Sequence, residues 1–237
     1  VDFVAVTTAE PPLDVLARIH QRLGAHPFQG VYLTWDDLRR NPMDLGERPH
    51  AHDGRLKPGR LTPVTWHTLA HHGVTCRGPK PGELDLWSDP AVLAAWTDDN
   101  LRRYWGRLVT SASRTVSPRG LAALGGYATV WIVTGVSRMH YTLATGDITS
   151  KTGAAWHARA TFPERWHRVI DEALRLRAAD DTARPSLAGL VAGLAEHFGS
   201  PRRSLYGSPL ERRRDVLAFA AEVMAAAHQL HTGRVED

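Results

Sequence analysis

Two cationic residues stand out because of the sequence around them. Arg138 lies within residues 127–145, a run that would be apolar on nearly every side of a helix. A helix that is apolar all round is buried, and an arginine is rarely fully buried without a partner. Arg138 is therefore expected either to pair with an internal carboxylate or to face a cleft that holds an anion. Lys151, a short turn beyond the expected helix end at Gly146, could serve the same cleft.

A carboxylate opens the first run of strand-forming residues. Asp2 is the one charge in VDFVAVT, residues 1–7. A carboxylate on a small sheet can hold Mg²⁺ against phosphate groups. The alternative is an ordinary polar residue at an edge or a frayed end of the strand.

Histidines gather in the first third of the chain and could ligate a metal. Zinc needs three or four ligands that converge at about 2 Å. His67 and His71 are four residues apart, so one helical face would present both. No HExxH pattern accompanies them and Cys76 stands alone, so solvent-exposed histidines are favoured over a metal site. The residues in question are His50, His52, Asp53, His67, His71 and His72.

Arginines on the expected helices could bind a phosphate backbone. They are interleaved with acidic residues on amphipathic segments, so solvated helix faces are expected and nucleic acid is not the favoured partner. This set comprises Arg102, Arg103, Arg107, Arg202, Arg203, Arg212, Arg213 and Arg214.

The composition is that of a globular protein with a small excess of positive charge. The 237 residues are 43% hydrophobic and 23% charged, with a net charge of +4, which suits an anionic ligand. No apolar run reaches the ~20 residues that cross a bilayer, and no signal peptide is recognisable. The single cysteine suits a reducing cytoplasm. The chain is also expected to be a monomer without membrane contact.

The elements that must position these residues change in character along the chain. A strand over 1–7, a helix after Pro11 and a strand over 30–35 form an α/β beginning. Residues 36–62 are expected to be irregular, followed by a helix over 63–72 and a short strand over 74–77.

GPKPGELD, residues 78–85, marks the expected domain boundary. The spacing beyond it predicts only helices, over 90–109, 127–145, from 150, from 163, over 187–198 and over 209–230. The sequence therefore predicts an α+β fold, with a partial mixed-sheet domain over 1–78 and a C-terminal α-helical bundle over 85–237.

The stretch SRMHYTLATGDITSKTGAAWHARATFPERW, residues 137–166, resembles the C-terminal helical domain of aminoglycoside adenylyltransferases. These are the streptomycin/spectinomycin type within the nucleotidyltransferase superfamily. VDFVAV resembles the second half of the family's strand S-D-x-D-hydrophobic, and HHGVTCRGP and DDNLRRYW resemble its linking region.

The resemblance implies transfer of AMP from Mg-ATP to a hydroxyl of an aminoglycoside-like molecule, a reaction of the antibiotic-resistance type. Asp2 falls on the second aspartate of the family's metal pair, so it is expected to bind Mg²⁺ and to serve catalysis. Arg138 and Lys151 fall on the arginine and lysine that meet the ATP phosphates. The resemblance implies in-line displacement at the α-phosphorus, with metal ions binding the attacking and the leaving oxygen.

The chain also departs from the family pattern. The Gly-Ser phosphate loop and the first metal aspartate would precede Val1, so the enzyme is expected to be incomplete in this chain. Gln29 stands where the family has a third carboxylate, the presumed base, and glutamine cannot take a proton. Arg177 replaces a tyrosine and Ala128 an acidic residue. The alternatives are a non-catalytic relative that binds a nucleotide or another small molecule, and a basic nucleic-acid module.

Overall fold

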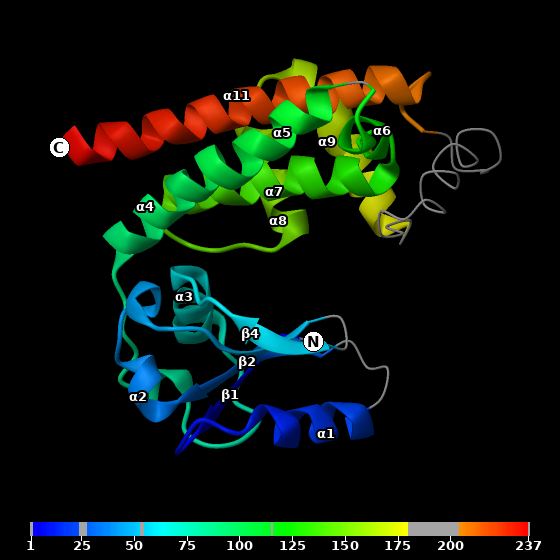
Figure 1. The fold of residues 1–237 in the computed structure, drawn as a ribbon. Helices are drawn as coiled ribbons and strands as arrows, with labels where there is room; N and C mark the ends of the chain where they lie inside the picture. Colours follow the sequence, from blue (N-terminus) through cyan, green and yellow to red (C-terminus); the bar gives the residue numbers. More distant parts are fainter. Residues whose placement is uncertain (1, 24–27, 53–54, 115, 180–203, 237) are drawn as a thin grey trace. The chain divides into compact units, whose positions relative to one another are not determined.

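The computed structural model describes residues 2–23, 28–52, 55–114, 116–179 and 204–236. It divides into two compact units, Val1–Leu93 and Ala94–Asp237, each with its own hydrophobic core. The first contains a four-stranded mixed sheet and the second is helical, which confirms the predicted α+β fold (Figure 1).

The sheet of the first unit has the order β1-β2-β3-β4, with β1 and β2 parallel and the other pairs antiparallel. The strands are β1 Asp2–Thr7, β2 Gln29–Thr34, β3 Arg48–His52 and β4 Arg55–Gly59. The helices are α1 Leu13–Leu23, α2 Trp35–Leu38 and α3 Pro63–His72, with 3₁₀ turns η1 Pro42–Asp44 and η2 Pro81–Glu83. Helix α1 makes the crossover that a parallel pair requires.

Two local expectations are wrong. Residues 36–62 are not irregular, since they contain α2, η1, β3 and β4. The sequences RPHAH and RLKPG do not predict strands, because each contains proline and neither has a β-branched residue. Residues 74–77 form no strand, and Val74 is 88% exposed. The expected helix over 63–72 is confirmed as α3.

The two faces of the sheet are covered by different helices. Val31 and Leu33 of β2 are buried with Trp66 of α3, whose indole nitrogen donates to the Leu38 carbonyl at 3.1 Å. Side chains alternate between faces along a strand, so Tyr32 points the other way. There it contacts α1, because His20 Nε2 lies 2.9 Å from the Tyr32 hydroxyl.

The second unit is built around α7, which packs against α8, α9 and α11 (Figure 1). Its elements are α4 Pro90–Asn100, which begins in the first unit, the π-helical turn η3 Leu101–Trp105, α5 Gly106–Ser113, α6 Pro118–Ala122, α7 Gly126–Thr145, α8 Lys151–Thr161, η4 Glu164–Trp166, α9 His167–Ala178 and α11 Pro209–Glu236. No strand follows β4 in the described part of the chain. The helix expected over 187–198 lies outside the described residues.

Helix α7 forms and ends as its sequence predicts. Gly146 takes the left-handed conformation, φ 77°, and its amide closes the last turn on the Thr142 carbonyl. Buried hydroxyl groups in the helix are satisfied locally, since Thr134 donates to the Val130 carbonyl and Ser137 to that of Val133, both at 2.7 Å. Because their hydroxyl groups are hydrogen-bonded within the helix, Thr134 and Ser137 can be buried in the apolar core.

Candidate functional site

Arg138 projects from α7 toward the turn that leads into α8. Its side chain is half-buried, and Nε donates to the Thr149 carbonyl at 3.0 Å. A guanidinium has five N–H donors in a planar fork, and this contact uses one of them.

Lys151 is the first residue of α8, directly after the N-cap Ser150, whose hydroxyl accepts from Gly153 N at 3.0 Å. Its ammonium lies 4.9 Å from the ring centre of Trp131, a cation–π distance. Trp131 stacks on Tyr127 and donates through its indole nitrogen to the Tyr104 hydroxyl at 3.3 Å. Lys151 therefore rests on an aromatic surface supplied by α7 and η3.

A third cation reaches the same helix start, and it was not assigned a contact there from the sequence. Arg177 of α9 donates through Nε to the Thr152 hydroxyl at 3.0 Å. Arg138 and Arg177 thus hold Thr149 and Thr152, on either side of Lys151. Three cations at the N-terminus of α8, where backbone amides and the helix dipole also favour negative charge, make a strongly electropositive region.

Asp2 and Gln29 lie side by side in the first unit. They are register partners on β1 and β2, so their side chains leave the same face of the sheet. Asp2 is exposed and Gln29 is partly buried. Mg²⁺ is commonly held by one or two carboxylates together with substrate phosphates, so a single exposed carboxylate fits an ion that takes further oxygens from a nucleotide.

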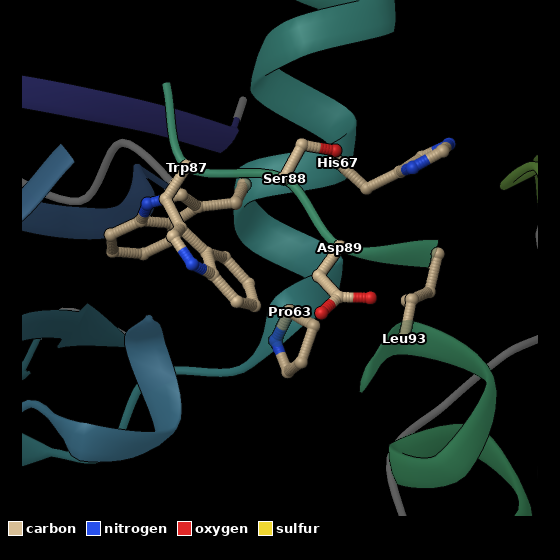
Figure 2. Close-up of a pocket in the computed structure, with 7 residues that line it drawn as sticks. Pro63, His67, Trp87, Ser88, Asp89 and Leu93 are labelled. Atoms are coloured by element: carbon tan, nitrogen blue, oxygen red, sulfur yellow. The ribbon is translucent and has the colours of Figure 1, made fainter. Parts of the chain in front are cut away.

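A small pocket of the first unit lies beside α3 and is not part of this chemistry. It is lined by Pro63, Trp66, His67, Trp87, Ser88, Asp89 and Leu93 (Figure 2). Its carboxylate belongs to Asp89, which accepts from the amides of Ala91 and Val92 at 2.8 and 3.2 Å. Asp89 therefore caps the start of α4.

The histidines that were considered as metal ligands are spread over different elements. The rings of His67 and His71 approach to 4.3 Å between centres on α3, as their spacing predicts. His50 Nδ1 lies 2.8 Å from the Arg48 carbonyl on β3, and His52 ends that strand. Asp53 lies outside the described residues.

Two arginines expected on solvated faces are instead buried. Arg212 and Arg213 are 7% and 8% exposed. Arg212 donates to the Leu124 carbonyl at 2.7 Å, and Arg213 to the carbonyls of Ala112 and Ser113 at 2.7 and 2.8 Å. The expectation failed because their partners lie far away in sequence, which no charge pattern reveals: backbone carbonyls for both arginines and, for Arg212, also the buried Glu172. By contrast, Arg102 and Arg103 are exposed and pair with acidic residues one turn earlier.

Glu172 is another group that sequence reasoning missed. It is fully buried on α9 and accepts from Arg175, Ser204, Leu205 N and Arg212 at 2.7–3.3 Å. Burial acts to raise the pKa of Glu172, but the hydrogen bonds from Arg175, Ser204 and the Leu205 amide outweigh it and lower the pKa to about 2. This carboxylate is an anchor of the helical core.

These features define an α+β protein, a short mixed sheet followed by a helical bundle with a cationic helix start. Residues 107–198 match the family of the aminoglycoside adenylyltransferase C-terminal domain. This match supports the resemblance, and the matched segment contains Arg138, Lys151 and Arg177. A search of curated proteins gave no match. Among the described residues, no helix is both long and apolar enough to cross a membrane.

Proposed function

We propose that the chain is a nucleotidyltransferase that moves AMP from Mg-ATP to a hydroxyl of an aminoglycoside-like small molecule. The observation that carries the proposal is the cationic start of α8, inside the segment that matches the family. ATP brings four negative charges, and charge-assisted contacts to phosphate are among the stronger hydrogen bonds, on the order of 1.5–3 kcal/mol each. Aminoglycosides are themselves cationic, so an acceptor needs anionic groups elsewhere.

The roles of the residues follow from their chemistry. Arg138 and Lys151 hold the phosphates and offset the charge that builds up on the leaving pyrophosphate. Asp2 would hold magnesium, which when bound polarises the phosphate oxygens. The acceptor oxygen forms a bond to the α-phosphorus as the bond to pyrophosphate breaks, and the hydroxyl proton passes to a base. We expect the protein to act as a monomer in the cytoplasm, where ATP is present.

The second candidate function is a relative that binds a nucleotide or another small molecule without turnover. Gln29 favours it, because an amide at the position of the family's third carboxylate cannot remove a proton. Both functions use the same cations, and they differ in whether AMP leaves the site attached to an acceptor.

The test is incubation with α-labelled ATP, Mg²⁺ and a panel of aminoglycosides, together with calorimetric titration of ATP. Labelled acceptor and released pyrophosphate support transfer, and ATP binding without either supports the second candidate. Lys151→Ala should weaken ATP binding about tenfold or more, whereas Lys80→Ala, an exposed lysine in the 78–85 linker, should leave it unchanged. If neither protein binds ATP, both functions are wrong.

A further inference from the structure

A row of polar side chains crosses all four strands at one end of the sheet. Asp2 of β1 is the register partner of Gln29 of β2, and His52 of β3 is the partner of Arg55 of β4. The pairs Gly30–Ala51 and Val31–His50 fix the register between β2 and β3, and continuing that register by one residue places Gln29 opposite His52. Register partners project from the same face, so these four residues form one continuous row.

The row lies outside the buried part of its sheet face. Farther along β2 on that face, Val31 and Leu33 are 3% and 1% exposed beneath α3. In the row itself Asp2, His52 and Arg55 are exposed. A substrate can therefore reach these side chains in the first unit.

The two histidines of β3 have different surroundings, although they share a face. His50 is half-buried, its Nδ1 lies 2.8 Å from the Arg48 carbonyl, and a Cβ on Gly59 would come within 2.9 Å of its ring. His50 thus fills space above Gly59 as part of the sheet. His52 is exposed and stands next to the position that the family reserves for a carboxylate.

The proposed transfer needs a group that removes the hydroxyl proton, and Gln29 has no such capacity. Imidazole is the side chain that ordinarily titrates near neutral pH and most often serves as a general base. We propose that His52 is the general base of the proposed transferase, in place of the carboxylate absent at Gln29. The proton moves from the acceptor hydroxyl to an imidazole nitrogen as the O–P bond forms and pyrophosphate leaves, and it then passes to solvent.

Among the described residues of the four strands, five charged or titratable groups share this face with His52. Arg55 lies directly opposite on β4 and Lys57 diagonally, Asp2 lies two strands away, and His50 and Arg48 are on the same strand, where Arg48 donates to Asp37 at 2.7 Å. Arginine and lysine stay cationic over the range in which histidine titrates. A pH dependence that is lost in His52→Gln and kept in His50→Gln therefore reports on His52.

The experiment measures AMP transfer as a function of pH, from about 5.5 to 9, in the wild-type chain and two variants. His52→Gln should lower kcat by about 10²-fold or more with KM for ATP within about twofold, and the rise of kcat with pH should disappear. His50→Gln should keep the profile. Adding Gln29→Glu to His52→Gln should restore transfer, because a carboxylate then stands in the family's position.

The role of His52 rests on the proposed function, and different experimental outcomes would overturn the two proposals. If the wild-type chain transfers AMP and His52→Gln does so with unchanged kcat and unchanged pH profile, His52 is not the base and the proposed function stands. If the wild-type chain transfers no AMP, both are overturned. Circular dichroism checks that each variant is folded, which the exposure of His52 leads us to expect.

Discussion

The Nδ1 atom of His140 lies 3.1 Å from the Nε2 atom of His157, so one imidazole donates to the other between α7 and α8. His140 is 4% exposed and its ring packs on Phe162. Burial, followed by the charge on His157, lowers the pKa of His140 to about 4, and burial lowers the pKa of His157. The pair is held neutral in the folded helical unit.

The helical unit should therefore lose stability as the pH falls from about 6.5 toward 4. The unfolded chain binds protons at the ordinary histidine pKa, whereas the folded pair resists them, so the stability contribution is complete above 6.5 and declines below it. The change is on the order of 3 kcal/mol, since one pKa unit is about 1.4 kcal/mol. Urea unfolding at pH 7, 6 and 5 measures the first part of this change, about 2 kcal/mol by pH 5.

His140→Leu is the matching variant for that experiment. It should be less stable at pH 7, because His157 loses its partner, but its stability should depend less on pH between 7 and 5. If the free energy of unfolding of His140→Leu falls with pH as steeply as that of the wild type, the histidine pair does not cause the pH dependence.

Glu172→Gln should destabilise the helical unit by about 3–5 kcal/mol, because it removes the anionic partner of two arginines in a buried site. Glu222→Gln is the control, since Glu222 pairs with the exposed Arg165 at 2.7 Å, and it should cost less than about 1 kcal/mol. Thermal unfolding at pH 7 compares the two. Equal losses would mean that the Glu172 network is not an anchor.

Substitution of two helical glycines by alanine should have effects of opposite sign. A Cβ at Gly135 of α7 would fall 2.0 Å from the Trp105 ring, so Gly135→Ala should cost about 1–3 kcal/mol through overpacking. At Gly233 of α11 a Cβ meets nothing within 4 Å, so Gly233→Ala should add up to about 1 kcal/mol through helix propensity. Chemical unfolding measures both, and a stabilised Gly135→Ala protein would contradict the packing argument.

Arg138→Ala should separate ligand binding from stability. The side chain is half-buried and holds the Thr149 carbonyl, so its loss should cost about 1 kcal/mol of stability. Loss of ATP affinity should be about ten- to a hundredfold. Arg119→Ala, an exposed arginine of α6, serves as the control. Collapse of the fold in Arg138→Ala would instead assign this residue to the core.

The strongly patterned elements were predictable from sequence. The apolar run with its terminal glycine predicted α7, and short runs rich in β-branched and aromatic residues predicted β1 and β2. Strands β3 and β4 escaped prediction because their residues have low strand propensity and their pairing depends on tertiary context. Arg138 and Lys151 were singled out by their places in the sequence and assigned to the ATP phosphates by family resemblance, and their roles remain predictions. Arg177 and His52 could be placed only by the contact between α8 and α9 and by the register between β2 and β3.

The bonds of Arg212 and Arg213 also bear on how the chain folds. These residues, at the start of α11, reach carbonyls of Leu124 and Ala112, which lie 88 and 101 positions earlier. Contacts of such long sequence separation form late, after the entropy of closing a large loop has been overcome. Helix α11 also carries Phe219 and Val223 into the core. During synthesis the helical unit should therefore stay loosely packed until α11 has left the ribosome, and only then acquire its native core in one cooperative step.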